Sequence, residues 1–238
     1  MLDLRQISVF RGRAQVLRAV SLTVQQAEAV CLVGRNGAGK TTTMDSIMGL
    51  LPVKSGRITL GERDITRVPA HARARLGVGY SPEDAGIFPD LTVAENLHIG
   101  QWLGASRGRQ SQSSGADVNE RIFAVFPEVR AFIHRRGLNL SGGQKKMVAI
   151  ARAMALAPSI LLLDEPFEGL APVVVSRFIE AVTKVKAMGI SLLIAESNLS
   201  TATRVADRLY AIDRGEVIFE GAPRSVLQNE EVMKTLRG

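Results

Sequence analysis

Nine consecutive residues combine three glycines, one lysine and two threonines in an order that suits the binding of phosphate groups. They are Gly34, Arg35, Asn36, Gly37, Ala38, Gly39, Lys40, Thr41 and Thr42, and they fit the pattern G-x-x-x-x-G-K-[ST]. In this pattern the glycines let the backbone approach closely, and free N–H groups point at phosphate oxygens. Lys40 would reach the β- and γ-phosphates of a nucleoside triphosphate, and the Thr41 hydroxyl would hold Mg²⁺.

The flanking residues supply the elements that this loop needs. The apolar residues 29–33 predict a buried strand before it, and residues 42–48 predict a helix after it. The positive end of the helix dipole would then point at the bound phosphates. A glycine-rich turn with an unrelated lysine is the alternative interpretation, and the strand–loop–helix order argues against it.

A second pattern adds the groups that hydrolysis needs. Four apolar residues, 160–163, precede Asp164 and Glu165, and continuous apolar runs are typical of strands buried in a parallel sheet. Ligands of such sheets bind at the carboxyl ends of the strands, so we expect Asp164 near the glycine-rich loop, where it can hold Mg²⁺. Glu165 is then the candidate to orient or deprotonate the attacking water. Two solvated acids at a strand end are the alternative.

A third pattern is a second helix start suited to anions. Ser141, Gly142, Gly143 and Gln144 open a helical stretch over residues 145–156. A hydroxyl, free N–H groups and the helix dipole would together favour phosphate there. Taken alone, an ordinary serine N-cap would explain the same residues.

With these three patterns the chain resembles the nucleotide-binding subunit of ATP-binding-cassette (ABC) transporters over nearly its whole length. The resemblance implies ATP and Mg²⁺ as ligands, and it implies that residues 141–144 of one subunit close over the ATP held by residues 34–42 of another. Two chains would then face head to tail and enclose two ATP molecules. It also implies that Phe10 stacks on adenine, although Phe10 could instead be a core aromatic at the end of the first strand.

Two positions depart from the general pattern of that family. Glu83 stands where a glutamine usually faces the metal and the water, and an ionised Glu can ligate Mg²⁺ but cannot donate a hydrogen bond. Ser197 stands where a histidine usually contacts the γ-phosphate, and serine cannot become a cation. We therefore expect hydrolysis to persist but to be slow.

Both departures resemble the subfamily that serves branched-chain amino acid importers. Further stretches are similar to that subfamily: residues 64–66, 69–71, 87–89, 91–97 and 169–172. The resemblance implies an importer for branched-chain or other amino acids. Urea or amide importers, a lipopolysaccharide exporter, an ABC ATPase on a soluble scaffold and an ATP-dependent clamp with little hydrolysis are the alternatives.

The resemblance also implies partners. Besides a second ATPase subunit, identical or different, it implies integral-membrane permeases that dock at the junction after Glu83. Ile87, Phe88 and Trp102 are the candidate apolar anchors of that groove. For Trp102, packing inside the helical region is the alternative.

Composition bounds the remaining possibilities. The 238 residues carry a net charge of +7, but no aromatic interleaving accompanies the dispersed arginines, so we expect a solvated basic surface and no nucleic acid partner. No apolar run approaches the roughly 20 residues that span a bilayer. We therefore expect a cytoplasmic protein that sits on the inner face of the cell membrane and touches it through partners only. Cys31, the single cysteine, is expected in the core.

The predicted fold class is α/β: a P-loop NTPase domain of the ABC type with an antiparallel β layer and a helical subdomain. We expect one domain over residues 1–238, with a core at about 1–89 and 156–238 and the helical subdomain at about 90–155. Within that subdomain, the polar residues 104–115 predict a weakly ordered loop without chemistry.

Overall fold

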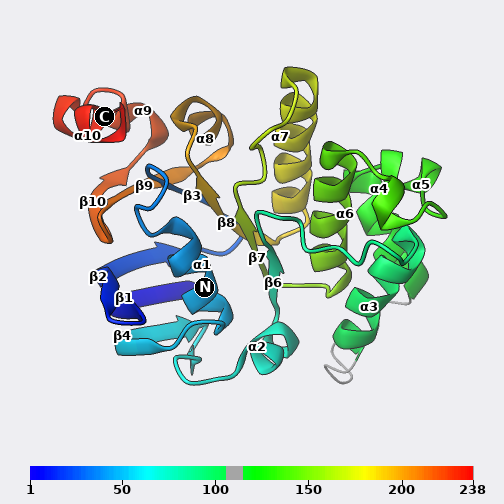
Figure 1. Ribbon diagram of the computed structural model, residues 1–238, viewed down its shortest axis with the longest axis horizontal. Helices are drawn as coiled ribbons and strands as arrows, with labels where there is room; N and C mark the ends of the chain where they lie inside the picture. The colour runs from blue at the N-terminus through cyan, green and yellow to red at the C-terminus, as the bar shows by residue number, and fades with distance from the viewer. Residues whose placement is uncertain (106–114, 238) are drawn as a thin grey trace.

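Two β-sheets of different kinds lie side by side in a computed structural model, which describes residues 1–105 and 115–237 (Figure 1). The larger sheet has the order β10-β9-β3-β8-β7-β6, and only its β9–β10 pair is antiparallel. Its strands are β3 (Ala29–Val33), β6 (Val78–Ser81), β7 (Ile160–Asp164), β8 (Ser191–Glu196), β9 (Arg208–Asp213) and β10 (Glu216–Gly221). Every residue of β3, β7 and β8 is buried, as the continuous apolar runs of a parallel sheet predict.

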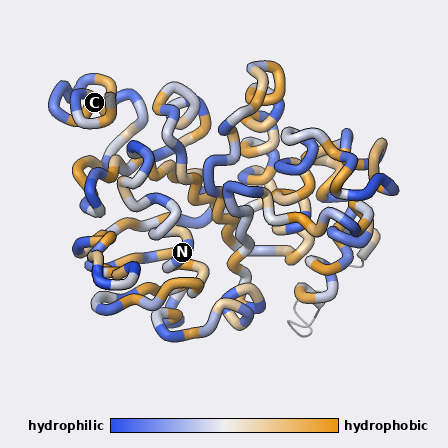
Figure 2. Tube along the Cα trace, in the orientation of Figure 1, coloured by the Kyte–Doolittle hydropathy of each residue, from blue (hydrophilic) through white to orange (hydrophobic). Residues whose placement is uncertain are grey.

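The smaller sheet is antiparallel and has the order β2-β1-β4-β5. Its strands are β1 (Leu2–Arg11), β2 (Ala14–Val24), β4 (Val53–Leu60) and β5 (Arg63–Asp64). Successive side chains of β3 point to opposite faces of the larger sheet. Val30 and Leu32 pack in the hydrophobic cluster that includes the smaller sheet, and Cys31 and Val33 pack in the cluster on the other face. The central strands are correspondingly hydrophobic (Figure 2), and Cys31 is a core residue as expected.

Helices cover these sheets and form a separate group on one side of the molecule. They are α1 (Lys40–Met48), α2 (Ala70–Leu76), α3 (Val93–Ala105), α4 (Gly115–Val125), α5 (Glu128–Ala131), η1 (Gly137–Asn139), α6 (Gly142–Ala155), α7 (Pro172–Ala187), α8 (Leu199–Val205), α9 (Pro223–Val226) and α10 (Glu230–Arg237). Figure 1 shows α3, α4, α5 and α6 gathered at the right, beyond β6 and β7. Most of the predicted polar loop 104–115 lies outside the described residues. No helix in the described ranges is long and apolar enough to cross a membrane.

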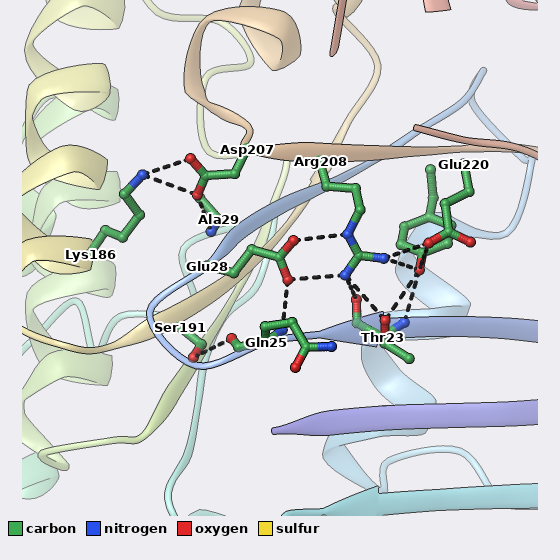
Figure 3. A network of polar contacts seen from close by, with 10 residues as sticks. Thr23, Gln25, Glu28, Ala29, Lys186, Ser191, Asp207, Arg208 and Glu220 are labelled. Atoms are coloured by element: carbon green, nitrogen blue, oxygen red, sulfur yellow. Dashed lines mark hydrogen bonds and ion pairs between the residues drawn. The ribbon is translucent and has the colours of Figure 1, made fainter. Parts of the chain in front are cut away.

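A polar network fixes the start of β3, the strand that leads into the glycine-rich loop (Figure 3). Arg208 Nε donates to Oε1 of Glu28 at 2.8 Å and Arg208 Nη2 donates to the Thr23 carbonyl at 2.8 Å, so one guanidinium joins β9, the residue before β3, and β2. Asp207 accepts from the Ala29 N–H at 2.9 Å and from Lys186 on α7. The loop therefore begins from a strand anchored to three neighbouring elements.

Candidate nucleotide-binding and hydrolysis site

The loop between β3 and α1 has a backbone that only glycine fits at two positions. Gly39, the N-cap of α1, has φ = 116°, and a Cβ there would lie 2.8 Å from Leu17 Cδ2. At Gly34 a Cβ would lie 2.4 Å from the Ile212 carbonyl oxygen. The predicted strand–loop–helix order is therefore present, and the loop wraps the N-terminus of α1 as phosphate binding requires.

A cavity of about 500 Å³ opens over this loop and collects eight of the predicted site residues, among them Lys40, Glu83 and Glu165. Its lining comprises Arg11, Val16, Asn36, Gly37, Gly39, Lys40, Thr41, Thr42, Glu83, Glu165 and Glu168. The strands β1, β3, β6 and β7 thus bring together residues that lie far apart in the sequence. Phe10 is 39 % exposed and does not line the cavity, whereas its neighbour Arg11 does. Adenine stacking on Phe10 stays a prediction.

Lys40 and the candidate base Glu165 form a buried ion pair inside the cavity. Lys40 Nζ lies 3.1 Å from Glu165 Oε1 and donates to the carbonyl oxygens of Gly34 and Arg35 at 2.8 and 3.2 Å. Glu165 has φ = 45°, a left-handed conformation that is costly for a residue with a side chain. The end of β7 therefore holds this carboxylate in an unusual backbone geometry beside the phosphate-binding lysine.

Asp164 has the properties of a metal ligand. Its side chain is buried, and neither carboxylate oxygen has a hydrogen-bond partner among the described residues. Burial raises the pKa of Asp164 to about 6, and the nearby carboxylates of Glu165 and Glu83 act in the same direction. A divalent cation would satisfy these oxygens, and Asp164 and Thr41 together fit Mg²⁺, which prefers few protein oxygens plus phosphate. No cluster of three acidic, histidine or cysteine ligands occurs in the described part of the chain, so nucleotide oxygens would complete the shell.

Ser197 lies beside the candidate base. Its backbone N–H and its hydroxyl both donate to Glu165 Oε2, each at 3.1 Å. The neighbouring Glu196 is buried at the end of β8, and its Oε1 accepts from the N–H groups of Ser197 and Asn198 at 3.0 Å. Burial and the nearby Glu165 raise the pKa of Glu196 to about 7.

Besides Val16 and Glu168, which line the cavity, three further residues of this site escaped prediction from the sequence. Arg11 donates to the Thr42 hydroxyl at 3.2 Å and to Asp45 at 2.7 Å. Glu196 is an acid at the end of an apolar strand, the same signal that marked Asp164. Lys146, on α6, reaches the backbone of Glu165, and no pattern within its own segment indicates that contact.

The residues 141–144 stand apart from this cavity. Ser141 caps α6 by accepting from the Gln144 N–H at 3.3 Å, and Gln144 Oε1 accepts from the Ser141 N–H at 3.0 Å. None of residues 141–144 lines the cavity of its own chain. A role for them at a nucleotide therefore needs a second chain.

A wider groove of about 1180 Å³ adjoins the cavity at Glu83. It is lined by Thr41, Asp45, Met48, Leu50, Ala74, Val78, Tyr80, Pro82, Glu83, Asp84, Gly86, Leu103, Lys146, Arg152, Leu156, Asp164, Glu168 and Gly169. The candidate anchors Ile87, Phe88 and Trp102 do not line it. Trp102 is 71 % exposed, so its alternative placement inside the helical region is wrong. Phe88 is also exposed and lies under the Arg152 guanidinium.

Comparison with known proteins gives consistent matches. A family model described as ABC transporter matches residues 17–168. The lipopolysaccharide export system ATP-binding protein LptB of Escherichia coli (strain K12) is 37 % identical over 229 residues, covering 96 % of this chain and 93 % of that protein. LptB of Haemophilus influenzae is 38 % identical over 224 residues, covering 94 % and 91 %.

Solved structures agree with the described fold. The ADP conformation of MJ1267, an ATP-binding cassette of an ABC transporter, superposes with a TM-score of 0.84 at 27 % identity and covers 100 % of this chain and 98 % of that one. The predicted fold class is therefore confirmed. The expected kinship to amino acid importers receives no support from these relatives, because the named curated ones serve lipopolysaccharide export.

Proposed function

Because the chain belongs to the ABC transporter family and is an ATPase subunit of a transporter, we propose that it hydrolyses ATP in the cavity over residues 34–42. The observation that carries this proposal is that Lys40, Thr41 and Glu165 line one cavity, while Asp164, at the end of β7, lines the adjoining groove together with Thr41. These are the positive charge, the two metal-binding oxygens and the base that phosphoryl transfer to water requires.

The chain's own residues divide the chemistry between them. Lys40 and the N–H groups of the loop neutralise the phosphate oxygens, and Mg²⁺, when bound to Asp164 and Thr41, supplies further positive charge at the β- and γ-phosphates. Glu165 accepts a proton from water as the water oxygen bonds to the γ-phosphorus, and the bond from that phosphorus to the β–γ bridging oxygen breaks. Ser197 holds the Glu165 carboxylate by two hydrogen bonds.

A second chain completes the proposed site. ABC ATPases work as dimers together with membrane permease subunits, and the exposed Ser141 and Gly142 at the start of α6 suit contact with the ATP of a partner chain. The permeases would dock at the groove beside Glu83 and hold the protein at the inner face of the cell membrane. We also propose that residues at about 90–155 form the helical subdomain.

For the cargo, the curated relatives favour export of lipopolysaccharide. Import of branched-chain or other amino acids is the second candidate, because Glu83 and Ser197 replace the usual glutamine and histidine, as in that importer subfamily. Urea and amide importers share these features.

Purification from membranes in mild detergent, with mass spectrometry of the chains that accompany the tagged protein, would separate these candidates. Permeases of a lipopolysaccharide export system would support export, and two different permeases with a second ATPase would support an amino acid importer. A soluble partner without any membrane protein would contradict the transport function.

A further inference from the structure

Lys146 connects α6 to the candidate base in the same chain. It lies on the first turns of the helix that begins at Gly142, directly after Ser141. Its Nζ donates to the backbone carbonyl oxygen of Glu165 at 2.5 Å. The contact joins residues 19 positions apart and runs from the helical region to the end of β7.

This contact fixes one side of a strained backbone. Glu165 has φ = 45°, and its own N–H donates to the Ala195 carbonyl of β8 at 3.0 Å. The N–H of Glu165 is thus held by the sheet, and its C=O accepts from Lys146 at 2.5 Å and from the Glu168 N–H at 3.3 Å, so Lys146 makes the shorter of these two contacts. A left-handed conformation persists only where surrounding groups hold it. The hydrogen bond from Lys146 therefore helps to set the direction in which the Glu165 side chain leaves the backbone.

Lys146 also places a positive charge among acidic groups. The carboxylates of Glu83, Glu165, Glu168 and Glu196 all act on it electrostatically, and they oppose the fall in its pKa that burial causes. Glu83 and Glu168 line both the cavity and the adjoining groove, and Lys146 lines the groove with them. Its ammonium therefore reduces repulsion between acids that must lie near a triphosphate.

We propose that Lys146 is a positioning residue for hydrolysis: it fixes the backbone of Glu165 and balances the acids around it, so that the seating of α6 decides whether the base is aligned. This inference rests on the proposed ATPase function. Because residues 141–144 lie at the start of the same helix, their position would affect Glu165 of their own chain through Lys146.

The test compares ATP hydrolysis by purified wild-type protein with the variants Lys146→Met, Lys146→Gln and Lys146→Arg. The matched control is Lys184→Met, which removes a lysine that likewise donates to a backbone carbonyl, that of Ala124 at 3.0 Å, and that does not line the cavity. We expect Lys146→Met to lower kcat about tenfold or more while KM for ATP changes less than about twofold, because alignment of the base affects the transition state and not ground-state binding. Lys146→Arg should recover most of the loss, Lys146→Gln should recover less, and Lys184→Met should match wild type.

Thermal unfolding of each variant separates alignment from folding. If Lys146→Met does not fold, the comparison of Lys146→Gln with Lys146→Arg decides the question, since both keep a donor and only Arg keeps the charge. The inference is overturned if kcat of Lys146→Met stays within about twofold of wild type, or if this variant raises only KM. It is also overturned if Lys146→Arg hydrolyses ATP as slowly as Lys146→Gln. A wild-type protein that binds ATP without hydrolysing it would overturn the proposed ATPase function as well, so the two failures are distinguishable.

Discussion

The hydroxyl and the backbone N–H of Ser197 both donate to one carboxylate oxygen of Glu165, Oε2, at 3.1 Å. The residue at the position of the family's switch histidine therefore contacts the base itself. A second oxygen of the same carboxylate, Oε1, lies 3.1 Å from Lys40. Both oxygens of the base are thus held before any proton is transferred, and the orientation of the carboxylate depends on Ser197.

We predict that Ser197→Ala lowers kcat about three- to tenfold with little change in KM for ATP. The variant removes one of two donors while the backbone N–H remains, and a typical net hydrogen bond contributes about 0.5–1.5 kcal/mol, which corresponds to roughly two- to tenfold in rate. Steady-state ATPase measurements check this. Ser200→Ala, on an exposed residue of α8, is the control, and equal kcat for Ser197→Ala and wild type would contradict the prediction.

Replacing the base is predicted to separate binding from turnover. Glu165→Gln should lower kcat at least about a hundredfold, because the amide cannot accept the proton of the water. ATP binding should persist, and ATP with Mg²⁺ should trap a head-to-tail dimer that gel filtration detects. Glu62→Gln, an exposed acid remote from the cavity, is the control. Turnover by Glu165→Gln within tenfold of wild type would assign the base to another residue.

The glycine-rich loop and the Asp164–Glu165 pair could be predicted because each signal lies within one strand and the residues after it. The apolar runs before them fix the strands, and parallel strands bring their ends together. Contacts onto Glu165 could not be predicted, because Lys146 and Ser197 reach it from 19 and 32 residues away. The packing of α6 and β8 decides those distances, and no local pattern encodes them.

The cavity lining predicts that Arg11 contributes to nucleotide affinity. Arg11 donates to Thr42 and Asp45 and faces the cavity, so Arg11→Ala should raise KM for ATP about fivefold with kcat unchanged, through loss of a charge near the phosphates. Arg13→Ala, two residues away and exposed, is the control. If Phe10→Ala raises KM and Arg11→Ala does not, adenine stacking on Phe10 is the dominant contact on this side.

Glu83 lies where the cavity meets the groove, and it lines both. We predict that Glu83→Ala reduces transport in a reconstituted complex more than it reduces ATP binding, because the side chain faces the phosphates and the proposed permease site together. The control is Glu62→Gln in the same complex. Equal losses of transport and of ATP binding would show that Glu83 acts on the nucleotide alone.

The Arg208 network predicts acid-dependent stability. Burial alone would raise the pKa of Glu28, but the Arg208 guanidinium and the Gln25 N–H outweigh burial and hold that pKa below its ordinary value of 4.5. In this range the unfolded chain binds more protons than the folded one, so the contribution of Glu28 is complete above about pH 4.5 and is lost as the pH falls through its folded value. Glu28→Gln should therefore lower the free energy of unfolding at pH 7 by about 1 kcal/mol and by less at pH 3. Urea unfolding at both pH values measures this, with Glu216→Gln on the exposed edge of β10 as the control; an equal loss at both pH values would mean that packing and not charge supplies the stability.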